Sequence, residues 1–141
     1  MRIVLDTNVL VSGLLSPGGP PGRIVDLVTA LRVLVLHDDR ILAEYRELLA
    51  RLRLGIRPVE AAAVLDLVER DGILVSAPPL AIDLPDPDDL PFLEVAIAGR
   101  ADALVTGNER HFVLSGREPP IPVTNPASFL TLWLLREHAS E

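Results

Sequence analysis

Short apolar runs alternate along this chain with longer segments of mixed polarity. Runs at residues 2–5, 33–36, 73–75 and 103–106 have the length and composition of buried strands, and a weaker run at 121–124 contains a proline that suits an edge strand. Apolar residues recur at helical spacing over 23–32, 39–52, 58–70, 89–98 and 126–137, and a short helix is expected near 109–112. Strands alternating with helices predict one doubly wound, parallel α/β domain over residues 1–141.

The amino-acid composition excludes several kinds of active-site chemistry. With 141 residues, 49% of them hydrophobic, the chain can build one sizeable core. It has no lysine and no cysteine, which excludes Schiff-base chemistry, a P-loop lysine, disulfides and thiolate metal sites. The net charge of -7 argues against binding nucleic acid by charge alone, but bound cations offset local carboxylates. Lacking a signal peptide or a membrane-length apolar run, the sequence predicts a cytoplasmic protein with no membrane partner.

The first apolar run ends directly at Asp6, which is followed by Thr7 and Asn8. Open α/β sheets bind their ligands at the carboxyl ends of strands, so Asp6 is a candidate site residue. Asp, Thr and Asn are also favoured helix N-caps, and on position alone capping explains Asp6 equally well.

In the helix expected over 39–52, with Asp38 or Asp39 as its cap, one glutamate borders the apolar stripe. Glu44 lies about 40° from Leu48 around the helix axis, whereas Glu47 lies about 100° away and is expected in solvent. Glu44 can therefore reach a cleft, although an ordinary exposed glutamate is the more common outcome. The stripe consists of Ile41, Leu42, Tyr45, Leu48, Leu49 and Leu52.

The densest acidic cluster, Asp86-Pro-Asp-Asp, precedes the helix expected over 89–98. Asp89 lies three residues before Phe92, on the face that Phe92 and Ala96 mark as buried, whereas Glu94 points roughly the opposite way. A helix cap needs only one of the three carboxylates. The cluster therefore favours a site role for Asp89 and leaves the roles of the other two open.

Asp6, Glu44 and Asp89 are all expected at the same edge of the sheet. Clustered carboxylates repel one another unless a cation joins them, and hard oxygen ligands favour Mg²⁺ or Mn²⁺ over Zn²⁺. Such a cluster suits metal-assisted phosphodiester cleavage. Thr106 and Asn108 are candidates for positioning water or the phosphate, although a Gly-Asn turn explains them nearly as well.

The remaining polar candidates are weaker. His37, His111 and His138 are not at metal-ligand spacing and are expected on the surface or in loops; His111 alone is a candidate for substrate contact. Scattered arginines usually serve solubility, but five are candidates for RNA phosphate contacts. These are Arg23, Arg40, Arg100, Arg110 and Arg117.

As a set, these motifs resemble the PIN-domain ribonucleases, and among them the toxins of toxin-antitoxin pairs. The motifs are Leu5-Asp-Thr-Asn-Val-Leu-Val-Ser12, the helix around Glu44, the stretch from Asp86 to Ala96, the segment 101–108, and the closing Pro126-Ala-Ser-Phe-Leu130. The resemblance implies a parallel sheet of order 3-2-1-4-5 with an acidic pocket at its switch point. That pocket is expected to bind Mg²⁺ or Mn²⁺ and to cut single-stranded RNA.

Carried over by position, the resemblance implies that Asp6 and Asp89 hold the metal and that Glu44 completes the catalytic pocket. Asn108 stands where many relatives have a fourth aspartate. This change puts a second metal site in doubt, because an amide ligates a cation without neutralising its charge. Asn8 and Thr106 are expected to position substrate or water.

The resemblance to the toxin group implies a cognate antitoxin, and the final helix is a candidate surface for an antitoxin groove or a homodimer. The final helix, which contains Trp133, is apolar over more of its circumference than one buried face needs, and core packing is the alternative to an interface.

Three other classes are compatible with parts of the sequence. Phosphate-accepting receiver domains also carry strand-end aspartates, but they use a lysine that this chain lacks. Haloacid-type phosphatases resemble the opening motif but need a second aspartate where Asn8 stands. The stronger alternative is a catalytically weak PIN-fold module that binds RNA or protein, which a depleted acidic pocket would favour.

Overall fold

A computed structural model describes residues 1–51, 55–115 and 117–139, in which five strands form one parallel sheet of order β3-β2-β1-β4-β5. The predicted doubly wound class and strand order are therefore confirmed. In chain order the strands are β1 (Arg2–Leu5), β2 (Leu34–His37), β3 (Ile73–Leu74), β4 (Ala103–Val105) and β5 (Val123–Thr124). Each lies within two residues of its predicted bounds.

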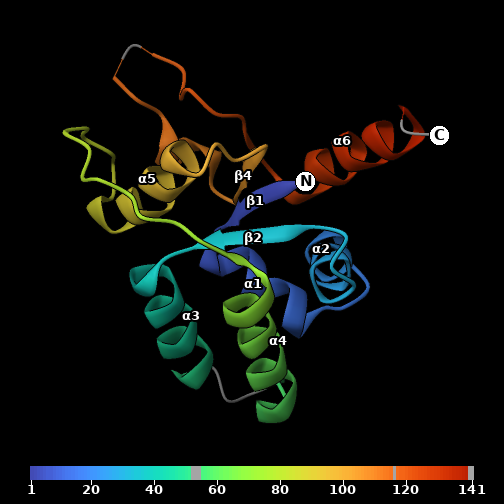
Figure 1. The fold of residues 1–141 in the computed structure, drawn as a ribbon. Coiled ribbons are helices and arrows are strands. Elements are labelled where there is room, and N and C mark those ends of the chain that lie inside the picture. The colour runs from blue at the N-terminus through green and yellow to red at the C-terminus, as the bar shows by residue number, and fades with distance from the viewer. Residues whose placement is uncertain (52–54, 116, 140–141) are drawn as a thin grey trace.

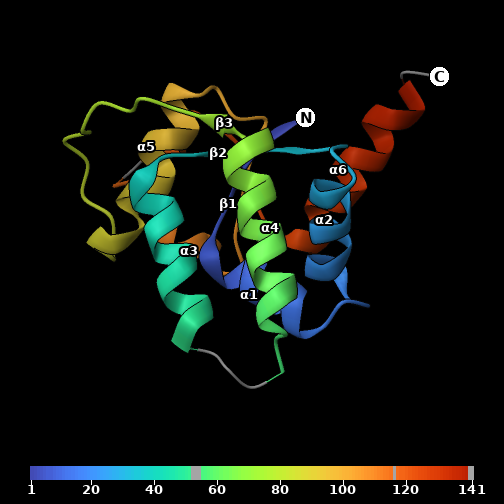
Figure 2. The same ribbon diagram turned by 60° about the horizontal axis from the view of Figure 1, so that its bottom comes forward.

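Helices cover both faces of this sheet. They are α1 (Thr7–Leu15), α2 (Pro20–Thr29), α3 (Asp39–Arg51), α4 (Pro58–Asp71), α5 (Leu90–Ala98) and α6 (Pro126–Ala139), with the 3-10 helices η1 (Pro87–Asp89) and η2 (Glu109–Phe112). Figure 1 shows α1, α3 and α4 below the sheet and α5 above it, and Figure 2 shows α6 beside α2. Within the described ranges, no helix has both the length and the apolar character needed to cross a membrane.

Capping by side chains fixes where two of these helices begin. Asp38 Oδ1 accepts a hydrogen bond from the Ile41 N–H at 3.0 Å and so caps α3, and Asn125 Oδ1 accepts one from the Ser128 N–H at 2.8 Å and caps α6. The apolar stripe of α3 faces the core as predicted, with Tyr45 fully buried. Leu52, the last residue of the predicted stripe, lies outside the described residues.

The prediction that Glu94 points away from the core was wrong. The five consecutive residues 92–96 of α5 are all buried, so the middle of this helix has no solvent face, and the segment before η1 packs Leu80 and Ile82 against the core. Glu94 is only 3% exposed, and a buried carboxylate requires partners. Its Oε1 forms an ion pair with Arg40 Nη1 at 2.6 Å, and its Oε2 accepts a hydrogen bond from the Leu80 N–H at 2.6 Å.

The expectation that His37 is a surface or loop residue was also wrong. His37 is the last residue of β2 and is 2% exposed, and neither ring nitrogen has a hydrogen-bond partner in the described part of the chain. Burial lowers the pKa of His37 below its ordinary value of 6.5, against the opposing effects of the Val68 carbonyl and of nearby carboxylates. Burial therefore favours the neutral imidazole at this position.

We predict that replacing this imidazole reduces the sensitivity of the fold to acid. Below about pH 6.5 the unfolded state binds more protons at His37 than the folded state does. The free energy of unfolding is therefore highest above this pH and decreases as the pH falls. A His37→Leu variant should be at least as stable as the wild type at pH 7.5 and should gain on it by about 1 kcal/mol at pH 5.5. Urea unfolding at both pH values measures this difference, and a difference that stays constant would contradict the prediction.

Candidate active site

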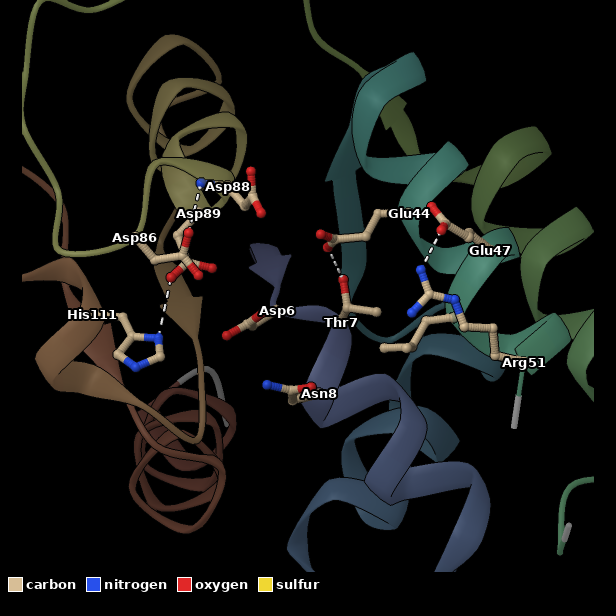
Figure 3. Close-up of a pocket in the computed structure, with 11 residues that line it drawn as sticks. Asp6, Thr7, Asn8, Glu44, Glu47, Arg51, Asp86, Asp88, Asp89 and His111 are labelled. Atoms are coloured by element: carbon tan, nitrogen blue, oxygen red, sulfur yellow. Dashed lines mark hydrogen bonds and ion pairs between the residues drawn. The ribbon is translucent and has the colours of Figure 1, made fainter. Parts of the chain in front are cut away.

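A cleft of about 440 Å³ opens at the carboxyl end of β1, beside the point where the strand order reverses. Figure 3 shows its two walls: η1 and η2 on one side, α3 on the other, with the β1–α1 junction between them. The cleft is lined by Asp6, Thr7, Asn8, Glu44, Glu47, Leu48, Arg51, Asp86, Asp88, Asp89 and His111. The three carboxylates predicted from the sequence thus meet in one place.

Asp6 lies at the base of the cleft and is 4% exposed. Its backbone N–H donates to the Val105 carbonyl at 2.9 Å, which joins the end of β1 to β4. Its side chain makes no capping hydrogen bond to α1, although Asp6 is the N-cap residue. Instead, Asp6 Oδ2 accepts a hydrogen bond from Thr106 Oγ1 at 2.7 Å. Burial raises the pKa of Asp6, and this hydrogen bond opposes the rise.

Thr106 holds Asp6 from behind. Its side chain is fully buried, and its hydroxyl oxygen also accepts a hydrogen bond from the Asn108 N–H at 3.0 Å. Neither Thr106 nor Asn108 lines the cleft, and Asn108 is exposed at the start of η2. Direct contact of these two residues with water or phosphate therefore stays a prediction. Asn8, by contrast, is exposed and lines the cleft.

Glu44 reaches the cleft from α3, where its carboxylate accepts a hydrogen bond from the Thr7 hydroxyl. The pKa of Glu44 is raised, first by burial and then by the negative charges of Asp6, Asp88 and Glu47, while the hydrogen bond from Thr7 lowers it. The next residue, Tyr45, donates its buried hydroxyl to the Leu5 carbonyl at the end of β1. Glu44 is therefore carried by a helix anchored to the strand that delivers Asp6.

Asp89 ends η1 on the opposite wall and makes no side-chain capping bond to α5. Asp86 has the capping role in this cluster, because its Oδ1 accepts a hydrogen bond from the Asp88 N–H at 3.0 Å. Asp89 Oδ2 lies 3.1 Å from His111 Nδ1. Burial, followed by the charges of Asp6 and Asp86, raises the pKa of Asp89 to about 6, with His111 opposing the rise.

The sequence did not point to Thr7, which binds the Glu44 carboxylate, or to Tyr45, which anchors α3 to β1, because each acts through one hydroxyl group. Only the position of Tyr45 inside an apolar stripe hints at its role, since a buried hydroxyl needs a hydrogen-bond partner. Glu47 was expected in solvent, and it is exposed, but it also lines the cleft mouth and forms an ion pair with Arg51.

The donor set suits a hard cation that keeps part of its hydration shell. Among the described residues, no three His, Asp or Glu side chains stand close enough together to cage a metal ion. Mg²⁺ commonly binds proteins through one or two carboxylates, with water and substrate phosphates as its other ligands. Asp6 at the base of the cleft and Asp89 on its η1 wall fit this mode (Figure 3), whereas a closed tetrahedral zinc site needs four protein ligands.

The comparisons with known proteins agree with this geometry. The family model described as PIN domain matches residues 2–110, so the chain belongs to the PIN-domain family, whose members are generally nucleases that use divalent metal ions. A segment of 44 residues is 39% identical to uncharacterized protein MJ1680 of Methanocaldococcus jannaschii. The matched segment covers 31% of this chain and only 28% of that protein.

A structural neighbour shares the fold over most of the chain. A chain in the crystal structure of VapBC2 from Rickettsia felis, bound to a DNA fragment from their promoter, superposes with a TM-score of 0.57. The match covers 89% of this chain and 98% of that one, at 18% identity. At this identity the likeness establishes the fold alone.

We predict that the acidic cleft lowers the stability of the folded chain at neutral pH. The folded pKa of Asp89 lies above its ordinary value of 3.8, so its contribution to stability is present below that value and is lost as the pH rises through about 6. With EDTA present, Asp89→Asn should be about 1–2 kcal/mol more stable than the wild type at pH 7.5, and this advantage should vanish near pH 4. Urea unfolding across this range measures it; a variant less stable at pH 7.5 would contradict the prediction.

Proposed function

We propose that this protein is a metal-dependent endoribonuclease that hydrolyses phosphodiester bonds in single-stranded RNA and acts as the toxin of a toxin-antitoxin pair. The observation that carries this proposal is the convergence of Asp6, Glu44 and Asp89 at the switch point of a PIN-domain sheet. The pKa of each of these carboxylates is raised, and the negative charge of Asp6 adds to the rise at both Glu44 and Asp89. A cation between the walls would relieve this repulsion.

In this proposal Asp6 and Asp89 hold Mg²⁺ or Mn²⁺, which supplies water activation and offsets negative charge on the phosphate. Thr106 fixes the orientation of Asp6 through its 2.7 Å hydrogen bond, and Thr7 fixes Glu44 on the facing wall. Glu44 completes the catalytic pocket. The exposed side chain of Asn8 positions substrate or water inside the cleft. The buried Thr106 contributes to this positioning through Asp6, and for Asn108 we retain the predicted contact with water or phosphate.

Basic side chains for the RNA backbone are few at the cleft. Arg40, one of the predicted phosphate contacts, pairs with Glu94 and Asp38 and does not line the cleft. Arg51 does line it, at the mouth beside Glu47, and is the arginine that we assign to an RNA phosphate. Its ion pair joins two exposed side chains and is therefore weak enough to exchange for a phosphate.

We further propose a cognate antitoxin and a homodimer as protein partners. The fold likeness to the VapBC2 structure supports the search for an antitoxin. On α6, Phe129 is buried and Trp133 is half-buried beneath Arg32, whose guanidinium carbon lies 5.4 Å from the ring centroid. Leu134 and Leu135 stay exposed. Core packing thus accounts for one face of α6 and leaves these leucines for a partner to cover.

Cleavage of a mixed single-stranded RNA pool tests the proposed activity. We expect the wild type to cut with Mg²⁺ or Mn²⁺ but not with EDTA, and Asp6→Asn to cut no faster than background. The Asn variant keeps the shape of the side chain, and a thermal unfolding midpoint no lower than that of the wild type shows that it is folded. If the folded wild type does not cut with either metal, the ribonuclease proposal fails and the PIN-fold binding module takes its place.

A second variant pair separates the hydroxyl of Thr106 from its volume. Val has nearly the shape of Thr but cannot donate to Asp6, whereas Ser retains the donor. Thr106→Val should lose roughly 10–100-fold in metal-dependent cleavage, and Thr106→Ser should stay within a few-fold of the wild type. Equal activity of the Val variant and the wild type would show that orientation of Asp6 by this hydrogen bond does not matter.

A further inference from the structure

Helix η2 contributes one side chain to the lining of the acidic cleft, and that side chain is His111. Asn108, at the N-cap of the same short helix, stays outside the lining. The His111 N–H donates to the Asn108 carbonyl at 2.9 Å, so one tight turn separates the two residues. The turn directs residue 111, rather than residue 108, toward Asp89.

The contact between His111 and Asp89 has a defined direction. Nδ1 of His111 lies 3.1 Å from Oδ2 of Asp89, and an ionised carboxylate can only accept hydrogen bonds. Nδ1 therefore carries the proton and donates it. Within the described ranges, the carboxylate of Asp89 has no other hydrogen-bond partner. This single bond engages Oδ2 and leaves Oδ1 for a ligand in the cleft.

The same arrangement recurs at the other two carboxylates of the cleft. One oxygen of Asp6 accepts a hydrogen bond from the Thr106 hydroxyl, and one oxygen of Glu44 accepts a hydrogen bond from the Thr7 hydroxyl. Each carboxylate is thus held by one side-chain donor from a different element. On the η1 wall, His111 has the same role for Asp89 that Thr106 has for Asp6 and Thr7 has for Glu44.

We propose that His111 is a positioning residue that fixes the Asp89 carboxylate for cation binding through its Nδ1–H. This inference rests on the proposed function, since it assumes that a divalent cation binds in the cleft. Helix η2 thus helps to orient a metal-binding carboxylate through His111, although residue 108 of this segment is Asn and not an acidic residue. Hydrogen-bonding partners of metal-binding side chains typically contribute 10–100-fold to metal affinity.

Two amide substitutions distinguish the donor position from a general effect of mutation. The side-chain nitrogen of Asn can occupy the place of imidazole Nδ1, whereas that of Gln corresponds to Nε2. We would measure Mn²⁺ affinity by titration calorimetry for the wild type, His111→Asn, His111→Gln and His111→Ala, and check each fold by its unfolding midpoint. The Ala and Gln variants should bind Mn²⁺ about 10–100-fold more weakly, and the Asn variant within about 3-fold of the wild type.

The outcomes separate this inference from the proposed function. If the wild type binds Mn²⁺ and His111→Ala binds it equally well, the positioning role is overturned while the metal site stands. If His111→Asn loses as much affinity as His111→Ala, donation from the Nδ1 position is overturned. If the folded wild type does not bind Mn²⁺, the proposed metal-dependent function fails, and the inference fails with it.

Discussion

Repulsion between carboxylates at the carboxyl end of β1 is the constraint on which the rest of this structure depends. Parallel strands deliver their ends to one edge of the sheet, and there Asp6 faces Glu44 on one wall and Asp89 on the other (Figure 3). Partial burial together with like charge raises the pKa of Asp89 to about 6. Keeping these carboxylates together lowers the stability of the folded chain at neutral pH, and the resulting cleft is suited to positive charge. A phosphodiesterase requires this property of its metal site.

The surrounding structure keeps the repelling groups from moving apart. Asp6 is fixed by its backbone hydrogen bond to Val105 and by the hydroxyl of Thr106, both from the β4 region. Tyr45 ties α3 to the end of β1 through the Leu5 carbonyl, so the wall that carries Glu44 is anchored to the strand that carries Asp6. These contacts are buried, where hydrogen bonds are least screened and unpaired groups are most costly. The base of the site is therefore held by buried hydrogen bonds, whereas its mouth is exposed.

Hydrophobic periodicity predicted the strands and the helices apart from α1 (Thr7–Leu15), because burial repeats with the period of each element. Together with the position of strand ends in a parallel sheet, it also pointed to the three carboxylates. It did not predict pairings between distant segments. The bond from Thr106 to Asp6 joins residues 100 positions apart, and no local pattern encodes it. The errors have a related cause in tertiary packing: the orientation of Glu94 was inferred for a helix with one solvent face, yet residues 92–96 of α5 are all buried. His37, expected on the surface or in a loop for lack of metal-ligand spacing, is buried at the end of β2.

The most direct test of the account is a crystal of the protein soaked in Mn²⁺ and examined by anomalous diffraction. We predict one strong anomalous peak in the cleft, within coordination distance of carboxylate oxygens of both Asp6 and Asp89. An empty cleft at a Mn²⁺ concentration that saturates other metal-dependent nucleases, or a peak bound only to side chains elsewhere on the surface, would contradict the claim that this acidic cleft is a metal site.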